Sequence, residues 1–147
     1  MTTELREAVA NDAEFVFEAK KQALGPFIGQ RWGWHEDYQR GVHNENWQKK
    51  PWSIILLDKT PIGTVSVDRR AQAIQLTDFY ILPDYQRRGF GTQVLARILY
   101  ECDSNDRDCE IRLLRGNKAE SFFRRHGFRE IENDDTHCFM IRNPRVP

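Results

Sequence analysis

The sequence has no long apolar run. None of its 147 residues belongs to a stretch that approaches the length of a membrane span, and the opening segment MTTELREAVANDAEF has no signal-peptide core. We therefore expect no membrane partner and no export. The chain also lacks an excess of either charge, because 22 Lys and Arg residues balance 22 Asp and Glu residues. Nucleic-acid binders usually carry excess positive charge, so we expect no nucleic-acid partner.

Cysteine is scarce, with three residues at Cys102, Cys109 and Cys138. Their number is odd and no two of them have a paired spacing, so we expect reduced thiols in a cytoplasmic protein. No Cys-x-x-Cys motif is present and the four histidines are scattered, which argues against a zinc site. We expect no bound metal.

The composition is that of an ordinary globular domain. Apolar residues make up 39% of the chain and charged residues 30%. A chain of this length is long enough to bury a core, and it contains no internal repeat. The sequence therefore predicts a single domain over residues 1–147.

Hydrophobic periodicity predicts strands and helices along this domain. A short strand at LREAV precedes a helix over residues 11–24, which starts at the cap-like Asn11 and is interrupted by GPFIG at residues 25–29. The other predicted elements are a second helix within residues 32–47, strands over 53–58, 62–68 and 74–82, a helix over 89–102, a strand over 110–114, a helix over 117–126, and strands over 128–132 and 137–143. This order predicts an α/β fold with a mixed sheet.

The segment QRRGFG, residues 86–91, has the features of an anion-binding loop. It follows a predicted strand and opens a predicted helix, whose first N–H groups lack partners and carry the positive end of the helix dipole. Gly89 and Gly91 allow close approach to the main chain, and Arg87 and Arg88 add positive charge. The glycine spacing fits neither a Walker loop nor a dinucleotide fingerprint. The simpler alternative is a capped helix with two solvated arginines.

Two motifs together resemble the GNAT superfamily of N-acetyltransferases. Gln86, Gly89 and Gly91 match the family's acyl-CoA pyrophosphate loop, [RQ]-x-x-G-x-[GA]. About thirty residues later, NKAESFFRRHGF at residues 117–128 is similar to the family's N-x-A-x-x-F-Y-x-x-x-G-F segment. The order of elements agrees as well, so the resemblance covers nearly the whole chain. It implies the GNAT fold, with a mixed, mostly antiparallel central sheet and helices on both faces.

The resemblance also implies which residues hold acetyl-CoA, the co-substrate of this family. The loop would bind the diphosphate through main-chain N–H groups. The preceding strand would splay from its neighbour, so that its backbone bonds the pantetheine arm and the acetyl carbonyl. The residues concerned are Gln86, Arg87, Arg88, Gly89, Phe90, Gly91 and Thr92 in the loop, Phe79, Tyr80 and Ile81 in the strand, and Asn117 and Phe123 in the second motif.

The activity implied is transfer of an acetyl group from acetyl-CoA to an amine of a small molecule or protein, by direct attack in a ternary complex. Phe123 stands where the family often has a tyrosine that protonates the leaving thiolate, and a phenyl ring cannot donate a proton. This departure keeps a second function open, that of a catalytically weak module that senses acyl-CoA. A third is the binding of another nucleotide at the loop.

Two residues are candidates for the base that removes the amine proton. Asp78 lies in the strand before the loop, and period two places it on the same face as Tyr80. His137 lies in the last hairpin, which borders the substrate cleft in this family, and histidine titrates close to neutral pH. The ordinary alternatives are an aspartate that bonds a loop amide and a solvated histidine.

Residues 32–39, WGWHEDYQ, form the candidate acceptor-binding segment. In the family the early helices form one wall of the acceptor cleft, and this stretch resembles a bacterial subgroup of small members from which it departs at His35. Trp34, Glu36 and Gln39 are the substrate candidates, because acids attract a cationic amine and tryptophan adds a cation–π surface. The alternative is that the tryptophans pack on the sheet and the acids are solvated. Dimers are frequent in this superfamily, so the resemblance also admits a homodimer.

Overall fold

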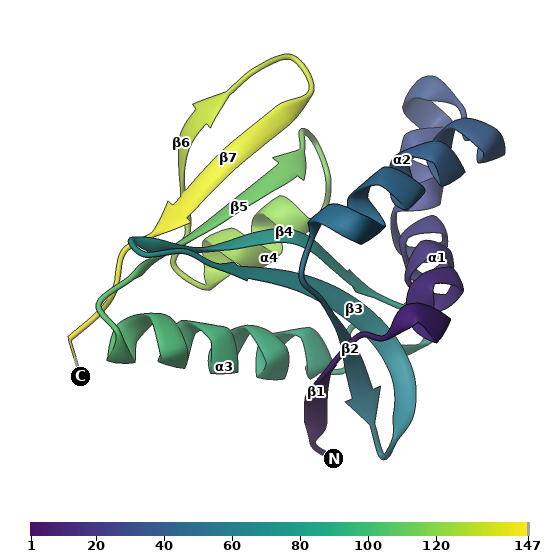
Figure 1. Ribbon diagram of the computed structural model, residues 1–147. Coiled ribbons are helices and arrows are strands. Elements are labelled where there is room, and N and C mark those ends of the chain that lie inside the picture. Colours follow the sequence, from purple (N-terminus) through teal and green to yellow (C-terminus); the bar gives the residue numbers. More distant parts are fainter. Residues whose placement is uncertain (147) are drawn as a thin grey trace. The chain divides into compact units, whose positions relative to one another are not determined.

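The structure is a computed structural model that describes residues 1–146. The chain falls into two compact parts, and each is described by itself below. Unit 1 comprises Met1–Ser66 and Asp78–Leu95, and unit 2 comprises Val67–Thr77 and Ala96–Pro147. Figure 1 labels the helices and strands along the chain.

Seven strands and four α-helices lie within the described residues, in the order that the periodicity predicts. The strands are β1 (Thr3–Glu7), β2 (Trp52–Leu57), β3 (Thr60–Arg69), β4 (Ala73–Ile81), β5 (Asp108–Leu114), β6 (Arg129–Asn133) and β7 (His137–Arg142). The α-helices are α1 (Ala13–Trp32), α2 (Glu36–Lys49), α3 (Phe90–Ser104) and α4 (Ala119–Arg125), and the short 3₁₀ helices are η1 (Ala10–Asp12) and η2 (Pro83–Tyr85). Three elements, β3, β4 and α3, pass from one unit into the other.

The strands form a mixed sheet with the hydrogen-bonded order β1-β2-β3-β4-β5-β7-β6. β4 and β5 pair in parallel, Ala73–Leu76 with Asp108–Ile111, and α3 lies between them in the chain. Antiparallel pairing joins β1 to β2, β2 to β3, β5 to β7 and β6 to β7. The prediction of a mixed, mostly antiparallel sheet is therefore confirmed.

The β2–β3 hairpin of unit 1 closes on a tight turn. Leu57 pairs with Thr60 across Asp58 and Lys59, whose φ angles are 49° and 68°. Positive φ at both central residues gives the turn whose twist matches that of the flanking strands. The hairpin is as predicted, with the turn starting one residue before the expected KTP.

α1 corrects the prediction of a helix that ends at GPFIG. The helix runs through residues 25–29 and ends at Trp32. Pro26 removes a helical hydrogen bond and the glycines disfavour helix, which is why the sequence predicts a break. Leu24 and Ile28 are buried on either side of the proline, and the burial of their side chains offsets this cost.

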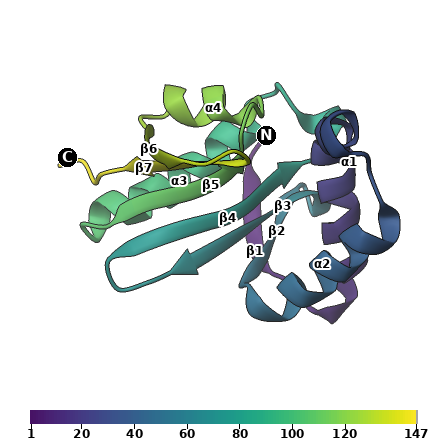
Figure 2. The same ribbon diagram turned by 90° about the horizontal axis from the view of Figure 1, so that it is seen from above.

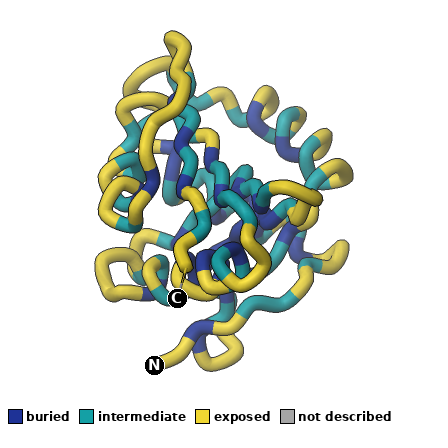
Figure 3. The backbone as a smooth tube through the Cα atoms, turned by 90° about the vertical axis from the view of Figure 1, so that its left-hand side faces the viewer, coloured by how far each residue is buried: buried dark blue, intermediate teal, exposed yellow. Residues whose placement is uncertain are grey.

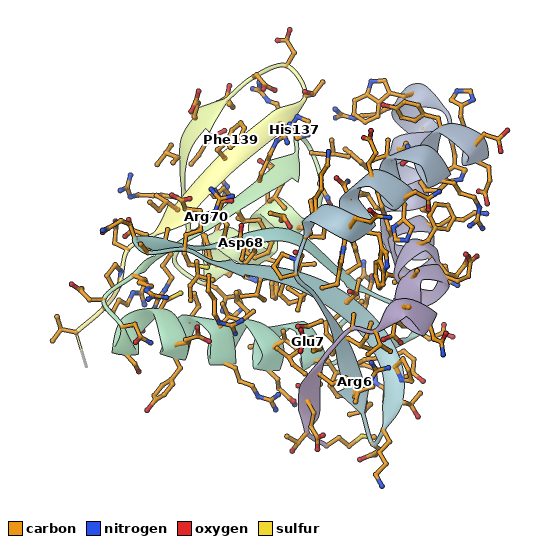
Figure 4. All side chains as sticks on the ribbon, in the orientation of Figure 1. Arg6, Glu7, Asp68, Arg70, His137 and Phe139 are labelled. Carbon is orange, nitrogen blue, oxygen red and sulfur yellow. The ribbon has the colours of Figure 1, made fainter. Side chains whose placement is uncertain are left out.

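The start of α1 also differs from the prediction, because Asp12 and not Asn11 stands at its N-cap position, and the Asp12 side chain bonds backward to Val9 at the start of η1. An Asp12 carboxylate oxygen accepts the N–H of Val9 at 2.8 Å. Both oxygens accept from Arg6 at 2.7 and 2.9 Å, and Arg6 is labelled in Figure 4. The Arg6 guanidinium lowers the pKa of Asp12. This ion pair joins β1 to the start of α1.

Helices α1 and α2 lie side by side in unit 1 (Figure 1, Figure 2). Phe17 of α1 contacts Trp34 with ring centroids 6.1 Å apart. Trp47 of α2 stacks on Trp52 of β2 at 6.1 Å. Three of the four tryptophans therefore pack within this unit, whereas Trp32 is 48% exposed.

Unit 2 contains β5, β7 and β6 side by side (Figure 1). Buried and half-buried positions alternate along β7, while every residue of β6 is exposed. Figure 3 colours the backbone by burial, with buried residues dark blue, intermediate residues teal and exposed residues yellow. α4 ends just before Gly127, whose φ of 92° is the left-handed conformation that the sequence predicts for a helix stop.

A nearly buried ion pair joins the end of β7 to the end of α3 in unit 2. Arg142, with 7% of its side chain exposed, donates to both carboxylate oxygens of Asp103 at 2.8 and 3.1 Å. The Arg142 guanidinium lowers the pKa of Asp103. The backbone N–H of Arg145 also donates to Asp103, at 2.9 Å.

Three further features concern residues 1–146, the part of the chain that the structure describes. No helix there combines the length and the apolar character needed to cross a membrane. The same residues contain no cluster of three or more His, Cys, Asp or Glu side chains arranged to hold a metal ion. The three cysteines are buried and free.

Candidate functional site

The loop between β4 and α3 lies in unit 1 and has the left-handed backbone that glycine favours. β4 ends at Ile81, η2 follows, and α3 begins at Phe90. Arg87 and Gly89 have φ angles of 61° and 85°. A Cβ atom built on Gly89 would have no atom within 4 Å, so the space beside this glycine is open. A ligand can therefore approach the main chain here.

The first turn of α3 presents backbone donors beside this open space. In this turn the N–H of Gln93 donates to the carbonyl oxygen of Gly89, at 3.1 Å. N–H groups earlier in a helix have no acceptor within it and carry the positive end of the dipole. The arrangement is suited to a phosphate group.

The side chains of the loop divide between anchoring and charge. The Gln86 amide donates to the carbonyl oxygen of Ile81 at 2.8 Å, which ties the loop to the end of β4. Arg88 lies over the rings of Tyr85 and Phe90, at 5.6 and 5.2 Å from their centroids. Arg87 and Arg88 are both exposed. Gln86 thus shapes the loop, and the two arginines supply positive charge around it.

Gln93 is a positioning residue that the sequence analysis missed. Its side-chain oxygen accepts the N–H of Thr3 at 2.9 Å, and its amide donates to the carbonyl oxygen of Met1 at 3.0 Å. These bonds hold the first turn of α3 against β1. No local pattern signals them, because the partners are about ninety residues apart in the chain.

The end of β4 lies unusually close to β3, at Gly63. A Cβ atom at Gly63 would clash with the carbonyl oxygen of Tyr80 and lie 3.1 Å from the Cα of Ile81. A glycine inside a strand is the sequence signal for such an approach. The parallel pairing of β4 with β5 covers Ala73–Leu76, so the predicted cofactor-binding positions Phe79, Tyr80 and Ile81 lie past its last pair.

Asp78, a predicted base, is held by two neighbours in unit 1. One carboxylate oxygen accepts from Lys50 at 2.8 Å and the other from the Tyr80 hydroxyl at 3.0 Å. The contact with Tyr80 agrees with their predicted place on one face of the strand. Burial and the Asp78 charge raise the pKa of Tyr80 well above its ordinary value. The phenol therefore stays protonated and donates to Asp78.

The acceptor candidates lie at the start of α2 (Glu36 and Gln39) and just before it (Trp34), and Glu36 is already engaged. Glu36 accepts from the Trp34 indole at 2.8 Å and pairs with Lys21 at 3.0 Å and with Arg40 at 3.3 Å. The indole and Lys21 lower the pKa of Glu36. Gln39 is buried. Glu36 therefore already has cationic partners, which leaves it poorly placed to attract a cationic amine.

Three predicted site residues lie in unit 2. The Asn117 side chain accepts the N–H of Ala119 at 3.1 Å, as a helix cap does. Phe123 is 2% exposed and packs edge-on against Phe122 and Phe128. The third residue is His137, at the start of β7.

Figure 4 labels His137 together with Phe139 of the same strand. The Nδ1 atom of His137 lies 2.8 Å from the Thr136 hydroxyl oxygen and 3.4 Å from an Arg112 nitrogen. Burial and the charge of Arg112 lower the pKa of His137. The ring is therefore neutral at neutral pH.

The predicted site residues thus fall into two groups. Unit 1 brings together the loop, the end of β4 and the Asp78–Tyr80 contact, and it also contains the acceptor candidates Trp34, Glu36 and Gln39. Unit 2 holds Asn117, Phe123 and His137. Lys50 belongs to the first group and was missed, since it reaches Asp78 from 28 positions away in the chain.

Comparison with known proteins places these features in a family. The model of the acetyltransferase (GNAT) domain matches residues 49–130, which is more than half of the chain and includes β4, the loop and α4. Among curated proteins, no sequence match was found.

Solved acetyltransferase structures share the fold at low sequence identity. The PaiA N-acetyltransferase of Thermoplasma acidophilum, in complex with coenzyme A, is 19% identical with a TM-score of 0.79, over 97% of this chain and 99% of that chain. An acetyltransferase of Thermus thermophilus is 23% identical with a TM-score of 0.74, over 97% of both chains. The ribosomal-protein-S18-alanine N-acetyltransferase of Escherichia coli is 13% identical with a TM-score of 0.70, over 99% of this chain and 96% of that chain. The fold expected from the two motifs is confirmed, and the chain belongs to the GNAT family of acetyltransferases.

Proposed function

We propose that the protein transfers an acetyl group from acetyl-CoA to a primary amine by direct attack in a ternary complex. The observation that carries this proposal is the loop of unit 1, where the open space at Gly89 meets the backbone donors of the first turn of α3. The coenzyme A in the Thermoplasma structure supports the same ligand here. The free thiols are in keeping with a cytoplasmic protein.

Three chemical events make up the reaction. The lone pair of the neutral amine attacks the thioester carbonyl carbon and forms a C–N bond. The tetrahedral oxyanion then collapses, the C–S bond breaks, and coenzyme A leaves as a thiolate that takes a proton from solvent or from an acid. The amine nitrogen loses one proton to a base or to water. Backbone donors near the end of β4 are suited to the oxyanion, because fixed dipoles need no reorganisation.

His137 is better prepared than Asp78 to accept the amine proton. The Nδ1 atom of His137 lies beside the Thr136 hydroxyl and beside Arg112, whose guanidinium can only donate. Burial and the charge of Arg112 lower the pKa of His137, so the neutral ring has a lone pair on one nitrogen with which to take a proton. Asp78 instead already accepts from Lys50 and from Tyr80. We therefore propose His137 as the base.

A second candidate function is the sensing of acyl-CoA with little turnover. Phe123 favours it, because the ring occupies the position of the usual tyrosine acid and is enclosed by other phenyl rings. The two functions differ in one measurement. Release of coenzyme A thiol from acetyl-CoA should rise in the presence of an amine acceptor if the protein is an enzyme, and should stay at the level of the blank if it is a sensor.

The sharpest test of the shared binding step is Gly89→Glu. This change places bulk and negative charge in the open space where the diphosphate would lie. We expect affinity for acetyl-CoA to fall about 100-fold or more, since like charges in contact cost several kcal/mol. Isothermal titration calorimetry measures the affinity, and circular dichroism shows whether the variant is folded.

Two controls separate charge from strain. Gly89→Ala adds only the strain of a side chain at positive φ, about 1–2 kcal/mol, and should retain most of the binding. Gly41→Glu places the same side chain on an exposed face of α2 with open space around it, and should bind normally. Normal binding by folded Gly89→Glu would refute the assignment of the loop.

A further inference from the structure

Lys20 is a charged residue in the buried stripe of α1. Positions three and four apart are neighbours on a helix, so Lys20 shares a face with Val16, Phe17 and Leu24. All three of these apolar neighbours are buried, and Lys20 itself is half-buried. Lysine is uncommon at such positions, because burial disfavours an ammonium group that has no partner.

The carboxylate near Lys20 is already engaged. The charges that act on Lys20 are those of Asp78 and Lys50, so its ammonium group lies within electrostatic reach of that ion pair. Both oxygens of Asp78 are occupied, one by Lys50 at 2.8 Å and the other by Tyr80 at 3.0 Å. Within residues 1–146, Lys20 forms no salt bridge of its own. The group thus contains two ammonium ions and one carboxylate.

The nearby acids of α1 and α2 do not supply the missing negative charge. Arg40 takes both oxygens of Glu14 at 2.9 Å, and Lys21 and Arg40 neutralise Glu36. These four charged residues balance one another. Burial is the largest effect on Lys20 and lowers its pKa, as expected for an ammonium ion without a full counter-charge.

We propose that Lys20 binds an anionic group of the acceptor, so that the acceptor class is an amine that also carries a carboxylate or a phosphate. An anion beside Lys20 would complete the charge balance of the group formed with Lys50 and Asp78. Charge-assisted bonds of this kind are among the stronger hydrogen bonds in proteins. The inference rests on the proposed acetyl transfer and specifies its acceptor.

The test compares matched acceptors that differ in one charge. L-amino acids are paired with their primary amides, and O-phosphoethanolamine is paired with ethanolamine, so the two arms distinguish a carboxylate from a phosphate. We expect kcat/KM, from release of coenzyme A thiol, to favour the anionic member of at least one pair by about tenfold or more. Equal or higher values for the neutral members would overturn the inference and leave acetyl transfer intact.

Three variants locate the effect at Lys20. Lys20→Met keeps the length and removes the charge, and should erase the preference for the anionic acceptor. Lys20→Arg should restore most of it. Lys49→Met removes an exposed lysine beside Lys50 and should change nothing. A preference that survives in folded Lys20→Met would overturn the inference.

Binding measurements separate an effect of Lys20 on the acceptor from an effect on coenzyme A. Coenzyme A should bind Lys20→Met within about twofold of the unchanged protein, and a tenfold loss would assign the anion to coenzyme A and refute the proposal. If no acceptor is acetylated, the midpoint of thermal unfolding, measured with each member of a matched pair, still tests whether Lys20 binds the anion. Stabilisation by the anionic members that depends on Lys20 supports the inference, and equal effects of both members refute it. Failure of acetyl-CoA to bind at all would instead count against the proposed function.

Discussion

At the scale of the residue, Gly63 is a position where the neighbouring strand leaves no space for a side chain. Gly63→Ala places a methyl group against the carbonyl oxygen of Tyr80, which is backbone and cannot rotate away. We expect the free energy of unfolding to fall by about 1–3 kcal/mol, the usual cost of overpacking. Urea unfolding followed by circular dichroism measures the change.

Gly41→Ala is the matched control for this substitution. Gly41 lies in α2, and a Cβ atom there meets nothing within 4 Å. The same methyl group should therefore raise stability by about 0.5–1 kcal/mol, because alanine favours helix over glycine. Equal stability of Gly63→Ala and the unchanged protein would mean that β3 and β4 are not in close contact.

Single residues of the site were predictable only where the signal is local. Period two in a strand predicts the shared face of Asp78 and Tyr80, and their hydrogen bond of 3.0 Å confirms it. The partner Lys50 follows α2, and nothing in a strand pattern points to it. The same holds for Lys20, because a helical pattern marks its buried face but not the charge that it meets there.

At the scale of the element, α1 shows why boundaries are harder to predict than element types. Local propensity favours a break at residues 25–29, and the helix nevertheless continues to Trp32. The burial of Leu24 and Ile28 is a tertiary effect, which becomes visible only once their neighbours are known. The strands and the remaining helices carry stronger periodicity, and they appear within a few residues of their predicted bounds.

The link between α3 and β7 gives an element-scale prediction. Asp103→Asn removes the charge that pairs with Arg142 and leaves the nearly buried guanidinium poorly compensated. We expect a loss of about 1.5–3 kcal/mol at pH 7, the range for a hydrogen bond to a charged group. Chemical unfolding of both proteins at the same pH measures the difference.

The pH dependence of that difference has a definite sign. Arg142 lowers the pKa of Asp103 in the folded chain, so the stabilisation is present above the ordinary aspartate pKa of 3.8 and is lost as pH falls through the folded pKa. The two proteins should differ by a constant amount from pH 7 to about 5 and converge below about 4. Asp106→Asn, at an exposed position, is the control and should match the unchanged protein. A gap that widens toward low pH would contradict the assignment.

At the scale of the whole molecule, three elements run through both units. β3, β4 and α3 each contribute residues to unit 1 and to unit 2. Unfolding of one unit would therefore break strands and a helix that also belong to the other unit. We predict that the chain unfolds as a single domain. Differential scanning calorimetry should give one transition with equal calorimetric and van't Hoff enthalpies. Two resolved transitions would contradict this prediction.

The family was predictable at this scale, whereas the acceptor was not. The two motifs are short segments whose order along the chain can be read directly, and the match over residues 49–130 confirms the family. The proposed acceptor site instead depends on how Lys20, Lys50 and Asp78, from three separate segments of the chain, come within electrostatic reach of one another. This proximity is a result of tertiary packing, and no local pattern in the sequence indicates it.

The fully exposed strand β6 has a consequence for the protein at high concentration. It ends the hydrogen-bonded order of the sheet, and within the described residues it pairs only with β7. An open strand edge is a template on which further strands assemble into fibrils. Arg129, Glu130 and Glu132 place charges along this edge, and a second strand would have to strip water from them. The charges on β6 therefore protect the chain from amyloid-like stacking at this edge of the sheet.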